Sequence, residues 1–170
     1  MELLELIRKR YSVRKYSDKV VEEEKLQKVL DAGRLAPTAE NNQPQRIYVL
    51  KSEEAVNKIR EITRCAYNAP IVLVFAFSKD EQWHSDIEEG ITSGQQDVSI
   101  IATHMMLEAA ELGLGTCWVN WFDHKKVKEA FLKDDEEVVL IMPLGYPSED
   151  SIPTGNHDNK KELQETVQII

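Results

Sequence analysis

The sequence is poor in cysteine and histidine, and this shortage excludes several kinds of site. Its 170 residues include only 2 cysteines and 4 histidines. Cys65 and Cys117 lie too far apart in sequence for a disulfide framework or a short-spaced redox motif. The histidines share no metal-ligand spacing with one another or with the cysteines. We therefore predict no disulfide and no metal centre, and a chain suited to a reducing compartment.

The chain also lacks long apolar runs and an excess of positive charge. Its longest apolar stretch, residues 71–77, is far too short to cross a bilayer, and the N-terminal MELLELIRKR has no signal-peptide core. The 21 lysines and arginines against 30 acidic residues give a formal net charge of −9. An acidic surface repels phosphate backbones. We therefore expect a cytoplasmic protein that binds neither nucleic acid nor a membrane.

Common catalytic motifs are absent as well. The chain contains no G-x-S-x-G elbow, no Walker A loop and no H-E-x-x-H helix. The sequence GLGTCW at 113–118 lacks the third glycine of a dinucleotide-binding fingerprint and is predicted to follow a helix rather than open one. We interpret it as a helix end followed by a tight turn.

Length and composition predict a single globular domain over residues 1–170. A domain averages about 150 residues, and 42% apolar with 30% charged residues is an ordinary globular balance. Hydrophobic periodicity predicts helices and strands in alternation. The helices are expected over 3–10, 22–35, 52–64, 97–112 and 123–132, and the strands over 47–50, 71–77, 116–121 and 138–142. By itself this alternation favours a parallel α/β sheet.

Three segments carry more specific expectations. The 97–112 helix is apolar nearly all the way round, so it must be covered on most sides by its own core or by a second subunit, and we expect its His104 to be a core residue. Residues 79–96 are the least periodic and are predicted to form a mobile flap. The terminal 166–170 run favours β structure and is expected to join a sheet edge, in this chain or a partner.

Two short segments are suited to binding, although each has an ordinary structural interpretation. Arg10, Ser12 and Arg14 alternate along an extended stretch and so point the same way. Two guanidinium groups beside a hydroxyl suit a phosphate, but a solvated patch explains them equally well. The amide-rich loop at 41–43 can bind the edge of a heterocycle, and it is also ordinary turn chemistry.

Aromatic and basic residues near the end of the chain are ambiguous in the same way. Trp118 and Trp121 are three residues apart in a predicted strand, so they do not share a face, and one of them is predicted to cover a ligand. Lys160 and Lys161 would by themselves be a solvated pair.

Four further motifs stand in order along the chain: KRYSVRKY at 9–16, LAPTAENNQPQRIYVL at 35–50, MMLEAAELGLGTCWV at 105–119 and PLGYP at 143–147. Together, and in this order, they resemble the motifs of the FMN-dependent nitroreductases, a family of NAD(P)H-dependent flavin oxidoreductases. The resemblance leaves only residues 79–96 and 148–159 unsupported. It implies an α+β fold in place of the parallel sheet: a three-layer sandwich with a central, mostly antiparallel sheet flanked by helices. It also implies a domain-swapped homodimer whose FMN sites lie at the interface.

The resemblance assigns roles to the N-terminal segment and to the tail. Arg10 and Ser12, with Tyr11 between them, would hold the FMN phosphate. Lys160 and Lys161 would join them where relatives commonly carry an arginine, which lysine replaces without the bidentate fork. Arg14 matches a cation beside flavin N1 and O2, where it stabilises negative charge on the ring.

The remaining predicted site residues surround the flavin ring. Asn41 matches an asparagine at the pyrimidine edge, in a loop that reaches the partner's cofactor in the family and that also contains Pro37, Thr38 and Gln43. Gly145 matches a turn glycine near the site. One segment falls where the family lays a strand against the ring, with backbone N–H groups near N5: Trp118, Val119, Asn120 and Trp121.

The resemblance implies an enzyme that passes a hydride from NADH or NADPH through flavin N5 to an electrophilic acceptor, such as a nitroaromatic or a quinone, in ping-pong order. No side chain acts as a nucleophile or general acid in that scheme, so no catalytic residue is predicted. The alternatives are the same fold with specialised chemistry, namely dehalogenation or flavin breakdown, a flavin-holding redox or binding module without rapid turnover, and a structural dimer without cofactor. The acceptor and the choice between NADH and NADPH stay open.

Overall fold

A four-stranded sheet forms the centre of the computed structural model, which describes residues 2–170. The strand order is β1 (Gln45–Leu50), β2 (Ile71–Ser78), β4 (Glu136–Gly145) and β3 (Gly115–Thr116). All three pairings are antiparallel, with Leu50 opposite Val72 and Ile71 opposite Leu144. The α+β fold implied by the family resemblance is therefore confirmed, and the parallel sheet suggested by the alternation is wrong. Between β1 and β2 the chain turns back at residues 63–70, so the helix there does not serve as a parallel crossover.

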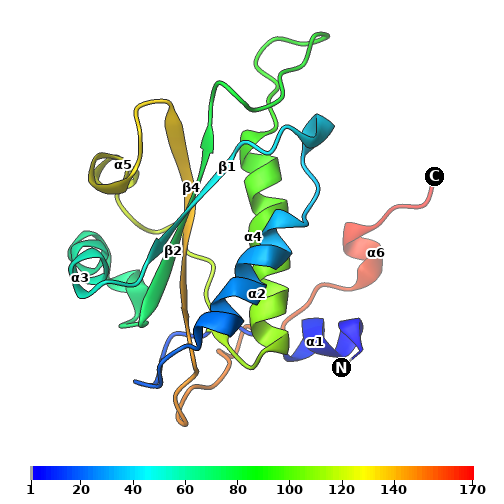
Figure 1. The fold of residues 1–170 in the computed structure, drawn as a ribbon. Helices are drawn as coiled ribbons and strands as arrows, with labels where there is room; N and C mark the ends of the chain where they lie inside the picture. The colour runs from blue at the N-terminus through cyan, green and yellow to red at the C-terminus, as the bar shows by residue number, and fades with distance from the viewer. Residues whose placement is uncertain (1) are drawn as a thin grey trace.

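Helices cover both faces of the sheet and make a three-layer sandwich (Figure 1). One face packs against α2 (Glu23–Arg34) and α4 (Gly94–Glu111), and the other against α3 (Glu53–Ile62) and α5 (His124–Phe131). All eight residues of β2 are buried, because it lies in the middle of the sandwich. Its side chains alternate between two cores: Leu73 and Phe75 face α2 and α4, whereas Val72 and Val74 face α3 and α5.

The helices begin close to where the sequence predicts them. Ser52 and Asp123 act as N-caps, since their side chains accept hydrogen bonds from the backbone N–H groups of Ala55 (3.2 Å) and Lys126 (3.0 Å). Short helices complete the chain: α1 (Leu3–Lys9), the 3-10 turns η1 (Ala39–Asn41) and η2 (Arg64–Ala66), and α6 (Leu163–Thr166).

The strand predicted over 116–121 is mostly absent, and the proline on the opposite strand explains why. Beyond Thr116 the pairing with β4 resumes only at Val119, which exchanges two backbone hydrogen bonds with Ile141. In this register Cys117 lies opposite Pro143, which has no N–H to donate, so the intervening pair cannot form.

Helix α4 starts three residues earlier than predicted, and its outward face differs from the prediction. His104 is exposed, and its Nδ1 lies 2.8 Å from the carbonyl oxygen of Ile100, so the expectation of a core histidine is wrong. The buried positions Ile101 and Met105 face the sheet, and His104 points elsewhere because a helix turns about 100° per residue. A groove of about 460 Å³ runs over this outer side. It lies between α1, α2 and α4, and its lining includes Leu3, Leu35, His104 and Leu107.

The segment 79–93 and the tail are irregular. The former turns back on itself with a single bridge between His84 and Thr92. After α6 the exposed end of the chain leads away from the body (Figure 1), and residues 166–170 pair with no strand in the described chain. No helix within residues 2–170 is long and apolar enough to cross a membrane.

Gly33 allows α2 and α4 to approach closely, which generates a stability prediction. A Cβ at this position would lie 2.6 Å from Sδ and 2.8 Å from Cγ of Met105. Gly33→Val should lower the free energy of unfolding by about 1–3 kcal/mol through overpacking, measured by urea denaturation. The matched control is Gly155→Val, because no atom lies within 4 Å of a Cβ built at Gly155. Equal stability of the two variants would contradict the role given to this contact.

Candidate functional site

A cationic cavity of about 260 Å³ lies where the segment after α1 meets the C-terminal tail. Arg10, Ser12 and Arg14 line one side, and Lys160 lines the other. The remaining lining residues are polar or aromatic: Tyr11, Thr154, Asn156 and His157. The structure thus brings together five residues that the family resemblance assigned to one site, Tyr11 among them, and Lys161 lies outside this lining.

The extended backbone at residues 10–14 explains why the three side chains share the cavity. Ser12 forms a parallel bridge with Thr116, and the Val13 N–H donates to the Thr116 carbonyl at 2.9 Å. Val13 is 2% exposed and packs against Gly115, where a Cβ would lie 2.5 Å from Val13 Cγ2. With Val13 held inward, alternation turns the residues on either side of it outward.

The tail closes the cavity through contacts with the N-terminal segment. The Tyr11 hydroxyl lies 3.0 Å from the carbonyl oxygen of Ser151 and 3.2 Å from its Oγ. His157 Nε2 lies 3.2 Å from the carbonyl oxygen of Arg8, and the Lys160 ammonium donates to the carbonyl of His157. These contacts hold segments more than 130 residues apart in sequence on either side of one cavity.

The charge of this cavity is not neutralised by neighbouring acids. Within residues 2–170, Arg10, Arg14 and Lys160 form no ion pair with a carboxylate. The protein as a whole carries a net charge of −9, so three unpaired cations in one cavity stand out. Guanidinium and ammonium groups with a hydroxyl are the donors that bind a phosphate ester. The donor set therefore fits the phosphate of FMN.

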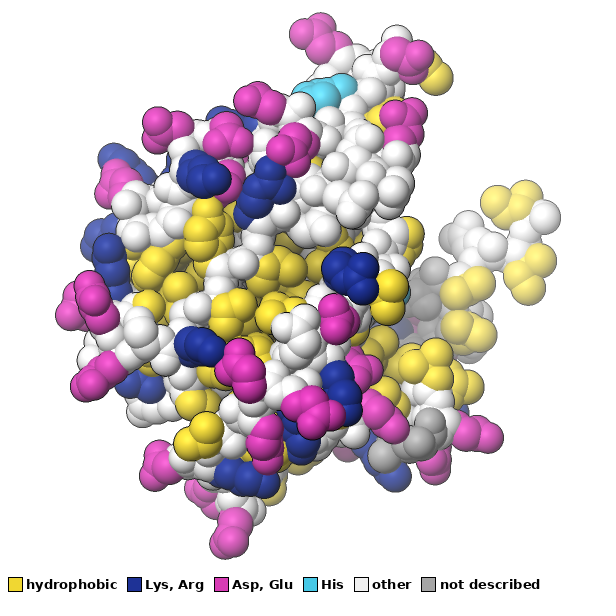
Figure 2. Space-filling view, in the orientation of Figure 1, with side chains coloured by type: hydrophobic (Ala, Val, Ile, Leu, Met, Phe, Trp, Pro, Cys, Tyr) yellow, Lys and Arg dark blue, Asp and Glu magenta, His cyan; other side chains and the backbone are white. Residues whose placement is uncertain are grey.

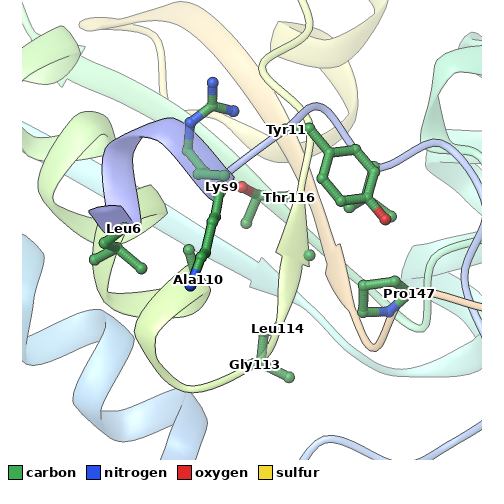
Figure 3. Close-up of a pocket in the computed structure, with 11 residues that line it drawn as sticks. Leu6, Lys9, Tyr11, Ala110, Gly113, Leu114, Thr116 and Pro147 are labelled. Atoms are coloured by element: carbon green, nitrogen blue, oxygen red, sulfur yellow. The ribbon is translucent and has the colours of Figure 1, made fainter. Parts of the chain in front are cut away.

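A smaller, mainly apolar cavity lies beside the cationic one (Figure 3). Tyr11 and Thr116 lie on one side of it, and Ala110 and Gly113 mark the C-terminal end of α4. Arg10 and Tyr11 line both cavities. The cationic site is thus attached to the C-terminal end of α4.

From the cationic cavity the site continues through Arg14 toward the segment after β3. Burial raises the pKa of the Cys117 thiol, while the Arg14 guanidinium and the Ser12 hydroxyl act in the opposite direction. Burial and a hydrogen bond with Cys65 raise the pKa of Tyr67, and a hydrogen bond with Arg14 opposes that rise. Arg14 is therefore in contact with a cluster that joins the loop at 63–70 to Cys117.

Residues 118–121 extend this surface, and their two tryptophans lie in different surroundings. Trp118 packs against the core on the α4 side, and its Nε1 donates to Asn120 Oδ1 at 2.6 Å. Trp121 is 64% exposed, with the Arg64 guanidinium 4.8 Å from its ring centroid. The Trp121 carbonyl accepts a hydrogen bond from Thr63 Oγ1 at 3.0 Å. Of the two tryptophans, Trp121 therefore has the more exposed ring.

Two predicted site residues here are turned toward protein. Val119 is buried in the core on the α3 and α5 side. At Gly145 a Cβ would lie 2.7 Å from Pro70 Cδ and 3.1 Å from Tyr16 Cδ1. Protein atoms thus fill the space that the missing Gly145 side chain leaves.

The amide loop, taken from here on as residues 37–43, lies at the opposite end of α4. The backbone N–H of Ala39 in this loop donates a hydrogen bond to Asp97, in the first turn of that helix, at 2.9 Å. Because α4 has 18 residues and each adds about 1.5 Å, roughly 27 Å separate its two ends. A single chain therefore does not bring the loop residues, Pro37, Thr38, Asn41 and Gln43, to the cationic cavity.

Several residues that contribute to these surfaces were not predicted from the sequence. They are Thr154, Asn156 and His157 in the tail, Tyr67 beside Arg14, and Asp97 under the amide loop. The sequence contained a signal for only one of them: Asp97 is an acidic residue in the first turn of the otherwise apolar helix α4. Within residues 2–170, no three His, Cys, Asp or Glu side chains are grouped to hold a metal ion.

Comparisons with known proteins agree on one family. The model of the nitroreductase family matches residues 7–67 and 63–146. A crystal structure of a nitroreductase family protein from Clostridium difficile 630 is 40% identical, with a TM-score of 0.91 over 99% of this chain and 98% of that chain. An FMN-dependent nitroreductase from Clostridium difficile R20291 is 27% identical, with a TM-score of 0.76 over 98% of each chain. A Methanothermobacter thermautotrophicus protein, provisionally named an NADH dehydrogenase/NAD(P)H nitroreductase, is 31% identical over 88% of this chain and 79% of its own length.

The two cysteines, Cys65 and Cys117, should differ in reactivity. Cys117 is 2% exposed and its pKa is raised, so little of it is thiolate near neutral pH, whereas Cys65 is half-buried. We expect iodoacetamide to label Cys65 first, and the labelling rate of Cys117 to keep rising above its ordinary pKa of about 8.5. Peptide mass spectrometry over a pH series measures both rates. Equal rates at every pH would contradict this prediction.

Proposed function

The chain belongs to the nitroreductase family, and from that premise we propose that it is an FMN-dependent oxidoreductase. It transfers a hydride from NADH or NADPH to an electrophilic acceptor such as a nitroaromatic or a quinone, in ping-pong order. The observation that carries this proposal is the cavity in which Arg10, Arg14 and Lys160 lie together without a neutralising carboxylate.

In this proposal different residues of the site bind different parts of FMN. FMN, when bound, supplies a ring that accepts a hydride at N5 and gives it up again. Arg10, Ser12 and Lys160 hold the phosphate. Arg14 carries a permanent positive charge beside the ring, where it stabilises negative charge at the pyrimidine edge. Trp121 and the backbone around Asn120 lie along the same surface, joined to the loop at 63–70 through Thr63.

The side chains of the site bind and orient rather than transfer protons. The cationic cavity contains no carboxylate, and its histidine, His157, contacts the Arg8 carbonyl. No general acid or base is therefore assigned, and the specificity for an acceptor comes from the shape and charge of the surface above the ring.

We propose that the working unit is a domain-swapped homodimer, in which residues 1–170 form one domain. The cationic cavity and the amide loop lie at opposite ends of α4, so a second chain is needed to complete a site. The groove over the outer side of α4 is lined by Leu3, Leu35 and Leu107. Figure 2 shows hydrophobic side chains gathered near the N-terminus and along the tail, where Ile169 and Ile170 are fully exposed. Exposed apolar surface of this kind is typical of an interface.

The first test is the purified protein without added cofactor. We expect a yellow protein that contains about one FMN per chain, is bleached by NADH or NADPH, and regains its colour when an acceptor is added. Absorption spectra and chromatography of the released chromophore measure this. A colourless protein that binds no added FMN would remove the proposal. Bound FMN without acceptor-dependent NAD(P)H oxidation would favour a redox or binding module.

Arg14 provides a test at the level of one residue. Arg14→Ala should weaken FMN binding by roughly tenfold. It should also lower the flavin reduction potential, by about 30 mV for each tenfold by which reduced flavin loses more affinity than oxidised flavin. Arg14→Lys should retain part of both effects, because it keeps the charge and loses the planar fork. Lys161→Ala is the control, since Lys161 lies outside the cavity lining. Unchanged affinity and potential in Arg14→Ala would refute the role given to Arg14.

A further inference from the structure

A buried carboxylate lies under the amide loop. Asp97 is 3% exposed and stands in the first turn of α4. Its Oδ1 accepts the backbone N–H of Ala39 at 2.9 Å, and its Oδ2 accepts the hydroxyl of Ser93 at 2.7 Å. Both carboxylate oxygens are thus engaged, one by the loop and one by the residue that precedes the helix.

The loop above Asp97 has an unfavourable backbone. Glu40, Asn41 and Gln43 have φ angles of 51°, 58° and 53°, in the left-handed region that side-chain-bearing residues avoid. Such strain persists only where the surrounding structure over-determines the backbone, and it concentrates at ligand clamps. Inside the loop, the Gln43 N–H donates to Thr38 Oγ1 at 3.1 Å. The Ala39 bond to Asp97 then ties the loop to a rigid helix.

The same carboxylate is connected to the irregular segment before α4. Ser93 Oγ, which donates to Asp97, accepts the backbone N–H of Trp83 at 3.1 Å. The Ser93 N–H donates to the Trp83 carbonyl, also at 3.1 Å, and the Gly94 N–H donates to Gln82 Oε1. Through Ser93, Asp97 therefore links the amide loop to residues 82–93.

A second unusual buried polar group lies near this loop. Gln45 Oε1 is buried and has no hydrogen-bond partner in the described chain. Gln45 begins β1 two residues after Gln43 and alternates with Ile47 and Val49, which face α4, so its side chain lies on the α4 side of β1. A buried acceptor without a partner is costly unless a donor arrives from outside the chain.

We propose that Asp97 is a positioning residue, which holds the amide loop and, through Ser93, residues 82–93 in the arrangement that receives the cofactor. The inference rests on the proposed function for the identity of that cofactor. A carboxylate suits the position because the N-terminal end of a helix stabilises negative charge and because two oxygens reach both segments at once. Asparagine would keep the acceptor for Ala39, and the Ser93 hydroxyl can rotate to accept from its amide.

The experiment compares Asp97→Ala, Asp97→Asn and Ser93→Ala with the wild type. Tyr48→Phe is the matched control, since it removes a hydrogen bond to the buried carboxylate of Glu136 on the opposite face of the sheet. Hydrogen exchange of peptides covering 37–45 and 82–93 reports the two segments. FMN titration and thermal unfolding are measured on the same samples.

Asp97→Ala should speed exchange in both segments by about tenfold or more and weaken FMN binding to a similar degree. Asp97→Asn should restore most of the affinity, and Tyr48→Phe should lose stability without changing either segment. Wild-type exchange in Asp97→Ala would overturn the proposal, as would equal effects from Tyr48→Phe. If Asp97→Ala does not fold, Ser93→Ala decides, with faster exchange at 82–93 as the expected result and unchanged exchange as the refuting one. Failure of the wild type to bind FMN would refute the proposed function. The exchange rates of 37–45 and 82–93 would still test whether Asp97 holds these two segments in place.

Discussion

The packing of helix α4 against the sheet is the constraint on which the other features of this structure depend. Its apolar face, with Ile101 and Met105, is buried against β2 and α2, and Gly33 permits the close approach of the two helices. Because the helix is rigid over its length, whatever is attached to its ends is held at a set separation. The amide loop and residues 82–93 are attached at the N-terminal end of α4. At its C-terminal end lie β3 and, beside β3, the Arg10–Arg14 segment.

This arrangement is the reason for the proposal that each chain contributes to two sites. The cationic cavity and the strained amide loop have complementary chemistry, one suited to a phosphate and the other to the edge of a heterocycle. Each half is held by its own contacts, Thr116 for the first and Asp97 for the second. The same helix presents an outward groove that its own chain leaves open. A second copy packed there would bring a loop to a cavity, which is the physical basis for the proposed dimer.

Much of the site was predictable because it depends on local alternation. Arg10, Ser12 and Arg14 share a face whenever their backbone is extended, and the helix caps at Ser52 and Asp123 are local as well. The predictions from sequence were wrong where a neighbouring strand or helix determined the local structure. Pro143 interrupts the strand expected at 116–121, and the packing direction of α4 leaves His104 exposed. Sequence periodicity does not indicate which residue lies opposite a given strand position, nor which side of a helix the rest of the chain covers.

The sequence by itself determined the approximate positions of α1 to α5, the continuous apolar run of β2, and the residue types of the Arg10–Arg14 segment, since these follow from periodicity and side-chain chemistry. The tertiary structure alone decided the antiparallel order of the strands and the meeting of Lys160 with Arg10 across the length of the chain. It also decided the burial of Asp97 beneath a loop that lies more than 50 residues before it. Contacts of this kind depend on chain reversals and on what packs opposite, and hydrogen bonds between distant segments leave no periodic trace in a single sequence.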